Sequence, residues 1–162
     1  VDADVIARGL SAFNVESVAI GAGRVMLARL RELAAQKVSF AFETTLASRS
    51  FAPWLAELKE VGYAVDLLFL WLPSPDFAIQ RVVDRMRRGG HAVPSETVRR
   101  RYGRGLRNFF RLYQPLASMW RLYDGSGPEP RLIAQRLENT GLKVYDESVW
   151  AIVKRQGTED EG

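Results

Sequence analysis

The chain has 162 residues, of which 47% are hydrophobic and 26% are charged, and its formal net charge is +4. This composition excludes a disordered, collagen-like or disulfide-stapled protein. The chain contains no cysteine, which excludes thiol nucleophiles, cysteine-type zinc sites and iron–sulfur clusters, and its single histidine argues against histidine-rich metal sites. A chain of this length predicts one domain with a core of its own.

The sequence carries no signal for a membrane protein. The longest apolar stretch, residues 65–72, is far shorter than the roughly 20 residues that a membrane-spanning helix needs. The chain opens with Val1 rather than Met, and neither a charged region nor an apolar signal core follows. We therefore expect a cytoplasmic protein without a membrane partner.

Hydrophobic periodicity and turn residues predict an alternation of helices and strands along the chain. The expected helices cover residues 15–36, 51–61, 75–88, 94–119 with a break near Gly103 or Gly105 and Pro115, and 146–155. The expected strands cover residues 38–42, 63–72, 120–124 and 131–135. Such an alternation predicts an α/β fold in which a parallel sheet is flanked by helices. We expect one domain over residues 1–155 and a flexible tail over 156–162.

Two local patterns refine these elements. Ser74, Pro75 and Asp76 supply a cap, a first-turn proline and a first-turn acid, which together predict a helix start. Gly21 and Gly23 weaken the first helix by roughly 1 kcal/mol each, so we expect close packing against a neighbour to explain them. They do not form a dinucleotide fingerprint, because a third glycine at the needed spacing and a preceding strand are missing.

The positive charge is concentrated in one segment. Eleven arginines lie between Arg81 and Arg121, against only Asp84 and Glu96. A guanidinium binds two oxygens of a phosphate or carboxylate at once. This segment is therefore expected to meet an anionic ligand.

Ligands of parallel α/β sheets bind at the carboxyl ends of the strands. Three polar groups are expected there: Asp2 and Asp4, residues 43–45 (Glu-Thr-Thr), and residues 73–74 (Pro-Ser).

Several segments, taken together and in this order, resemble the zeta toxin family of P-loop kinases. These are residues 1–4 (VDAD), 40–49 (FAFETTLASR), 72–75 (LPSP), Arg81 with Arg85, 89–94 (GGHAVP) and 122–127 (LYDGSG). The resemblance covers most of the chain and is closest to small, single-domain members described as ATPases or kinases. It implies a P-loop NTPase-like parallel sheet, with ATP and Mg²⁺ as cofactors. The implied reaction is transfer of the γ-phosphoryl group to a hydroxyl of a small acceptor, which in the toxins is a UDP-linked amino sugar.

The resemblance also implies roles for individual residues. Asp4 matches the catalytic base, and Arg81 and Arg85 match the start of the arginine-bearing lid. Acceptor-side positions fall on Glu43, Thr45, Arg49 and His91, where His91 stands in place of a second lid arginine. The nucleotide-side loop matches Asp124, Gly125 and Ser126. No metal ligand is assigned, and an antitoxin is a further candidate partner.

One departure concerns the phosphate-binding loop. A P-loop needs the pattern G-x-x-x-x-G-K-[ST], and none of the four lysines follows a glycine. In the family this loop and the first strand precede the segment that matches residues 1–4. We therefore expect both to be absent from this chain, and the chain by itself to be inactive as an ATPase.

The same residues also fit purely structural roles. Asp2 and Asp4 fit solvated residues near a chain end, and Glu43 fits a structural ion pair with an arginine. Arg81 and Arg85, at i,i+4, fit a solvated basic helix face. His91 fits a loop residue, and Thr44 and Thr45 fit caps of a turn. As a whole, the segment from Arg81 to Arg121 also fits a non-enzymatic module that binds RNA or another polyanion, with its aromatic residues either stacking on bases or forming core.

Overall fold

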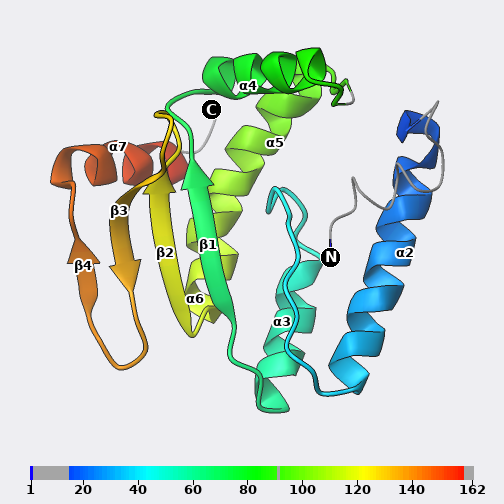
Figure 1. Ribbon diagram of the computed structural model, residues 1–162. Coiled ribbons are helices and arrows are strands. Elements are labelled where there is room, and N and C mark those ends of the chain that lie inside the picture. Colours follow the sequence, from blue (N-terminus) through cyan, green and yellow to red (C-terminus); the bar gives the residue numbers. More distant parts are fainter. Residues whose placement is uncertain (2–14, 91, 159–162) are drawn as a thin grey trace. The chain divides into compact units, whose positions relative to one another are not determined.

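The computed structural model describes residues 1, 15–90 and 92–158 of the chain (Figure 1). It divides into two compact units. The N-terminal unit comprises residues 1–44 with 89–91, and the sheet unit comprises residues 45–88 with 92–162. Each unit is described by itself.

The N-terminal unit contains the long helix α2 (Val15–Ala35). Ala22, Met26 and Leu30 recur every four residues and are buried, as the periodicity predicts for one helix face. The close packing expected around the two glycines is not found among the described residues, since a Cβ built on Gly21 or Gly23 would have no described atom within 4 Å.

The buried strand predicted over residues 38–42 is not observed. In the part of the chain that the structure describes, residues 38–45 are assigned to no strand, and none of them is buried. Lys37, which ends the helical turn after α2, has a φ of 56°. Apolar composition alone does not make a segment a strand, because strand propensity depends strongly on context.

The sheet unit is built on four strands in the order β1-β2-β3-β4. They are β1 (Asp66–Trp71), β2 (Met119–Asp124), β3 (Arg131–Arg136) and β4 (Leu142–Val144). Only β1 and β2 are parallel, while β2–β3 and β3–β4 are antiparallel. The expected parallel sheet is therefore a mixed one. Short connections join β2, β3 and β4, and strands joined by short loops must run in opposite directions.

The helices of this unit precede β1, connect β1 to β2, and follow β4. They are α3 (Phe51–Glu60), α4 (Pro75–Arg87), α5 (Ser95–Asn108), a π-helical turn (Phe109–Tyr113), α6 (Gln114–Leu116) and α7 (Glu147–Thr158). The predicted start of α4 is confirmed, since Ser74 Oγ accepts a hydrogen bond from the Phe77 N–H at 3.1 Å. Helix α7 continues three residues past the expected boundary at residue 155, so residues 156–158 belong to the folded unit.

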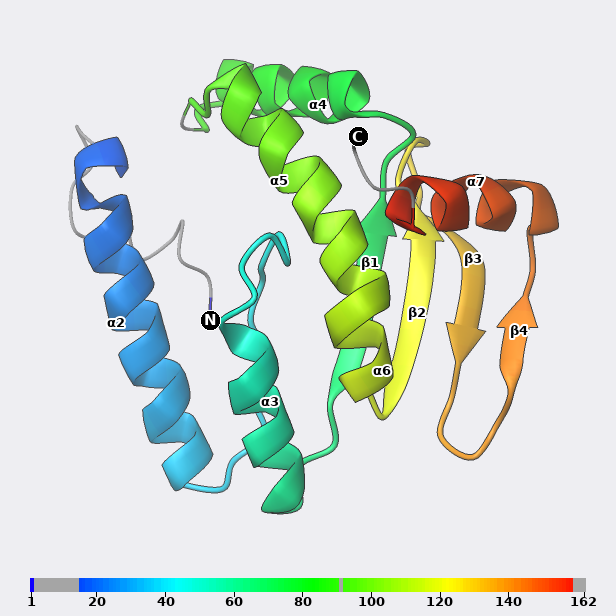
Figure 2. The ribbon, with the colours of Figure 1, turned by 180° about the vertical axis from the view of Figure 1, so that it is seen from behind.

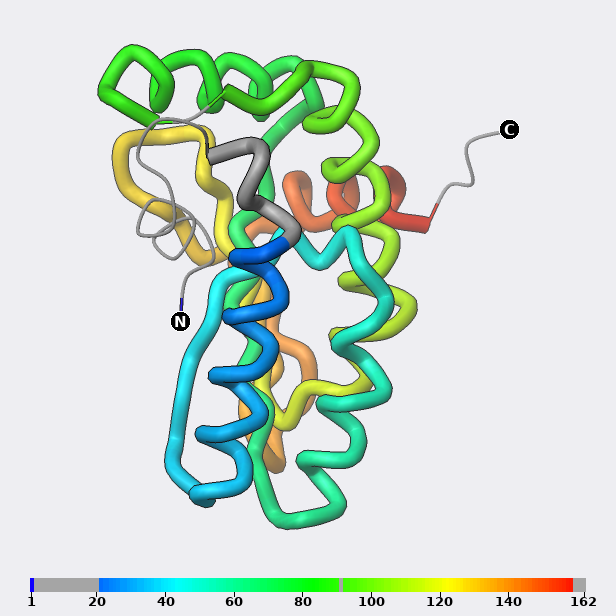
Figure 3. Tube along the Cα trace, turned by 90° about the vertical axis from the view of Figure 1, so that its right-hand side faces the viewer, coloured from blue at the N-terminus to red at the C-terminus, as the bar shows by residue number. Residues whose placement is uncertain are grey.

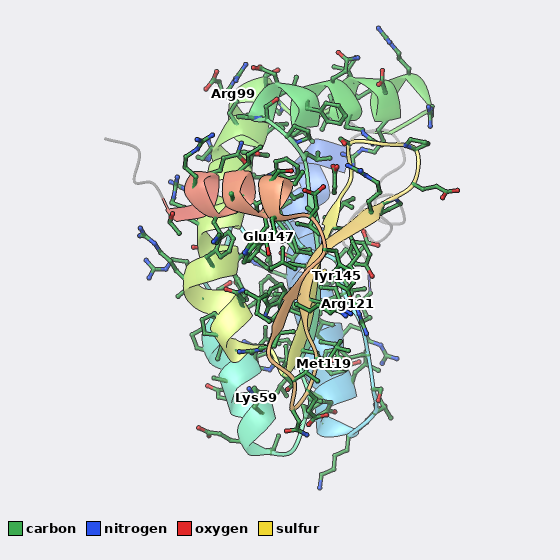
Figure 4. All side chains as sticks on the ribbon, turned by 90° about the vertical axis from the view of Figure 1, so that its left-hand side faces the viewer. Lys59, Arg99, Met119, Arg121, Tyr145 and Glu147 are labelled. Atoms are coloured by element: carbon green, nitrogen blue, oxygen red, sulfur yellow. The ribbon has the colours of Figure 1, made fainter. Side chains whose placement is uncertain are left out.

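The core of the sheet unit lies between one face of the sheet and helices α5 and α7 (Figure 2). Trp120 and Leu122 of β2 point to this face and are buried. Trp120 stacks on Trp150 of α7 at 6.0 Å between ring centroids, and Phe109 packs edge-on against Trp120. Because Phe109 and Trp120 are buried, aromatic residues of the segment from Arg81 to Arg121 contribute to the core. Alternation along β2 places Met119 and Arg121, labelled in Figure 4, on the opposite face.

Candidate active site

The parallel pair β1–β2 brings two predicted polar segments to the same edge of the sheet. Trp71, the last residue of β1, is paired with Asp124, the last residue of β2. Residues 72–74 therefore leave the sheet beside residues 125–127. This edge is the carboxyl end of the parallel strands, where ligands bind in open α/β sheets.

Asp124 anchors the loop that joins β2 to β3, residues 125–130. Its side chain is buried, and its Oδ1 accepts a hydrogen bond from the Ser126 N–H at 2.8 Å. Its Oδ2 accepts from Arg131 at 2.8 Å. Burial acts to raise the pKa of Asp124, but the hydrogen bonds from Arg131 and Ser126 outweigh burial and hold this pKa below its ordinary value. Asp124 is therefore a charged, internally bonded anchor.

Arg81 of α4 reaches the same loop. Its Nη2 donates hydrogen bonds to the carbonyl oxygens of Gly125 and Gly127, the second at 3.2 Å. Its guanidinium carbon also lies 5.5 Å from the centre of the Phe77 ring, one helical turn earlier. In the tube view of Figure 3 the loop, in yellow, lies beside α4. The structure therefore joins the predicted lid helix to the predicted nucleotide-side loop.

A polar network fixes the chain where it leaves β1. Gln156 of α7 accepts a hydrogen bond from Trp71 Nε1 at 2.9 Å and donates to the Pro73 carbonyl at 3.1 Å. The Tyr102 hydroxyl donates to the Leu72 carbonyl at 2.8 Å. Burial raises the pKa of Tyr102 to about 12, with the hydrogen bond to Trp71 acting in the opposite direction. Helices α5 and α7 thus hold residues 72–73 in place.

A second loop, residues 45–50, is tied to α5 and to the π-helical turn. Asn108 donates to the Leu46 carbonyl at 2.8 Å, and the Tyr113 hydroxyl donates to the Ser48 carbonyl. The Thr45 backbone passes so close to Gly105 that a Cβ there would overlap the Thr45 carbonyl oxygen. Gly105 therefore does not break α5 as expected. It continues the helix and lets the loop approach it.

Four of the residues predicted for the site meet at the edge of the sheet: Arg81, Asp124, Gly125 and Ser126. Arg85 lies one turn after Arg81 on α4 and is exposed. Thr45 and Arg49 belong to the loop on α5, and the Thr45 hydroxyl accepts from the Ala47 N–H at 3.5 Å, as a turn cap would.

Three other predicted residues are not brought to this edge by any described contact. Glu43 belongs to the N-terminal unit and is exposed. Asp4 and His91 lie outside the described residues.

Residues that were not predicted for the site hold these loops. They are Arg131, Gln156, Gly105, Asn108 and Tyr113. Only Gly105 carried a signal, because a glycine inside a helix indicates close approach of another backbone. Gln156 was assigned to the tail, and the others are polar or aromatic residues whose partners are distant in sequence.

Within the described residues, no group of three or more His, Cys, Asp or Glu side chains could hold a metal ion. The helices of the same residues include none that is long and apolar enough to cross a membrane.

Comparison with known proteins places this chain in a family. The family model described as "Zeta toxin" matches residues 6–119. The chain is also 28% identical, over 102 residues, to an uncharacterized protein of Haemophilus influenzae, a match that covers 63% of this chain and 73% of that protein. No solved structure gives a significant match. Because the family model spans well over half of its length, the chain belongs to the zeta toxin family.

Proposed function

We propose that this chain is the acceptor- and lid-bearing part of a phosphotransferase that transfers the γ-phosphoryl group of ATP to a hydroxyl of a small molecule. The observation that carries the proposal is the meeting of Arg81 with the loop after Asp124 at the carboxyl ends of β1 and β2. Membership of the zeta toxin family, which resembles P-loop kinases, supports the same reaction class. A UDP-linked amino sugar is the acceptor that this family suggests.

In the proposed reaction the acceptor oxygen forms a bond to the γ-phosphorus, and the bond to the β–γ bridging oxygen breaks. Asp4 takes the proton of the acceptor hydroxyl. Glu43, Thr45, Arg49 and His91 contact the acceptor. Arg85 places positive charge against the oxygens of the transferring group, where charge redistributes most in the transition state.

The residues at the sheet edge fit the base and sugar side of a nucleotide better than its metal. Asp124 is already bonded to Arg131 and to the Ser126 N–H, so its carboxylate is engaged within the protein. Gly125 and Ser126 instead offer backbone atoms beside it. Mg²⁺ would shield the phosphate charge, and we assign it no ligand among the described residues.

The base assignment is tested on the protein as its whole reading frame encodes it, with ATP as the donor and UDP-amino sugars among the acceptors. Asp4→Asn should abolish transfer and leave the Kd for ATP nearly unchanged, since a base acts on the hydroxyl and not on ATP. Asp2→Asn, two residues away, is the matched control and should remain active. Loss of ATP affinity as large as the loss of turnover in Asp4→Asn would contradict the role.

The cation assignment is tested on the same protein. Arg85→Ala should cost about 2–4 kcal/mol of transition-state stabilisation, seen mainly in kcat. Arg87→Ala is the control, because Arg87 lies on the same helix and pairs only locally with Asp84 at 3.3 Å in the described part of the chain. Equal, small effects at both positions would remove Arg85 from the mechanism.

A second candidate function is binding of RNA or another polyanion. It is favoured by the exposed side chains of Arg100, Arg101 and Arg104 along α5. Arg99, labelled in Figure 4, is instead paired with Asp76 of α4. Polyanion binding would weaken linearly in a plot of log K against log salt, with a slope that reflects several phosphate contacts. An absence of such binding at low salt would eliminate this candidate.

A further inference from the structure

We propose that Arg81 is a positioning residue that holds the β2–β3 loop, residues 125–130, against helix α4, and that it thereby governs nucleotide affinity rather than the transfer step. The part of this inference that concerns the nucleotide rests on the proposed function. The part that concerns the loop stands on the contacts alone.

Both backbone polar groups of Gly125 are bonded to the β1–α4 segment. Its N–H donates to the Trp71 carbonyl at the end of β1, at 2.8 Å. Its carbonyl accepts from Arg81 Nη2, which also donates to the Gly127 carbonyl at 3.2 Å. A Cβ at Gly125 would lie 2.8 Å from Leu70 Cγ, so the Leu70 side chain covers the same residue. The start of the loop is therefore held from the strand and from the helix.

The position of the Arg81 side chain is itself restricted, which allows it to hold the loop. Only three residues separate the end of β1 from the start of the helix that carries Arg81, and Ser74 caps the first turn of that helix. The Phe77 ring beneath the guanidinium limits the directions the side chain can take. Because α4 begins so close to β1, a bond from Arg81 to the loop ties the loop to the strand end.

The charge of Arg81 is directed at backbone carbonyls and not at a carboxylate. Arg85, one turn later, makes neither of these loop bonds in the described interactions. Loss of the Arg81 side chain would leave the Gly125 N–H and the Asp124 anchor in place but release two carbonyls to water. The loop would then sample other conformations, which lowers affinity for a ligand that needs one of them.

The loop part is tested by hydrogen–deuterium exchange on the chain itself, followed by mass spectrometry of the peptide that spans residues 122–132. Arg81→Ala should exchange roughly tenfold faster or more in this peptide, the factor expected when a charge-assisted hydrogen bond is lost. Arg81→Gln should behave in the same way, and Arg87→Ala should match the wild type. The peptide of α7 reports global opening and separates it from local release. Exchange in both Arg81 variants within about twofold of the wild type would overturn the inference.

The nucleotide part is tested by titrating a fluorescent ADP analogue into wild type, Arg81→Ala and Arg87→Ala, each produced from the whole reading frame. We expect Kd to rise roughly tenfold in Arg81→Ala only, and kcat at saturating ATP to fall by less than Kd rises. A fall in kcat with unchanged Kd would instead make Arg81 a transition-state cation and overturn this part. If the wild type binds no nucleotide, the proposed function and the nucleotide part fail together, while the exchange result still decides the loop part.

Discussion

Gly105→Ala is the substitution whose effect the structure defines best. A Cβ at this position would overlap the Thr45 carbonyl oxygen and lie 3.5 Å from the Thr45 carbonyl carbon. The obstacle is backbone, and it cannot rotate away as a side chain would. Asn108 and Tyr113 also bond the same loop to the helix, at Leu46 and Ser48, so moving the loop would strain these bonds as well.

Two opposing contributions set the size of the effect. Alanine should gain about 1 kcal/mol over glycine in helix propensity. Overpacking against a constrained neighbour costs typically about 1–3 kcal/mol, and the backbone obstacle puts this site at the upper end. We therefore expect a net loss of about 2 kcal/mol in the free energy of unfolding.

The assay is urea unfolding followed by tryptophan fluorescence, with Gly21→Ala as the control. A Cβ at Gly21 meets no described atom within 4 Å, so the control should gain up to about 1 kcal/mol. Under the proposed function, Gly105→Ala should also raise KM for the acceptor, because Thr45 and Arg49, the proposed acceptor contacts, lie on the displaced loop. A Gly105→Ala variant as stable as its Gly21→Ala counterpart would refute the reasoning.

Three further predictions concern charge, a buried hydroxyl and the edge of the sheet. The pKa of Asp124 is lowered in the fold. The stability that its carboxylate contributes is therefore present above the unfolded pKa of about 3.9 and is lost as pH falls through the folded pKa. Asp124→Asn should therefore lower the free energy of unfolding at pH 7 by about 1 kcal/mol. In urea titrations at a series of pH values, the variant should also lose less stability than the wild type as the pH falls. An equal loss in both proteins would contradict the ion pair. The fold favours the neutral phenol of Tyr102, whose pKa is about 12. The stability that this phenol contributes is complete below the unfolded pKa of 10.0 and is lost as pH rises through about 12. Tyr102→Phe should lower the free energy of unfolding by about 1 kcal/mol and abolish its alkaline pH dependence, as measured by thermal melts between pH 8 and 11. Melts like those of the wild type would exclude the hydrogen bond to Leu72 as a stabilising contact. Strand β1 pairs on one side only within the described sheet, and its Leu68 is 66% exposed. Sedimentation velocity should therefore show self-association of the wild type, and Leu68→Lys should reduce it. A wild type that is monomeric at all concentrations would contradict this prediction.

The sequence by itself determined the elements whose signals are local. The residues Ser74, Pro75 and Asp76 predicted the start of α4, which the structure confirms, because a cap and a first-turn proline act within one helical turn. The apolar run over residues 63–72 predicted a strand, which is observed as β1. Its hydrophobic pattern lies within one short segment, so it could be recognised without distant residues. The ordered set of motifs also indicated the family, which the comparison of residues 6–119 confirms.

Tertiary structure alone decided what depends on distant partners. Residues 38–42 have the composition of a buried strand, yet they are assigned to none, because strand formation depends on pairing and packing that local composition does not determine. The strand β4 was not expected, and its pairing with β3 is seen only in the folded sheet. The site follows the same rule. Spacing suggested Arg81 as one of two equivalent arginines on a helix, but only the folded chain brings Gly125 and Gly127 within reach of its guanidinium, 44 and 46 residues further along the sequence.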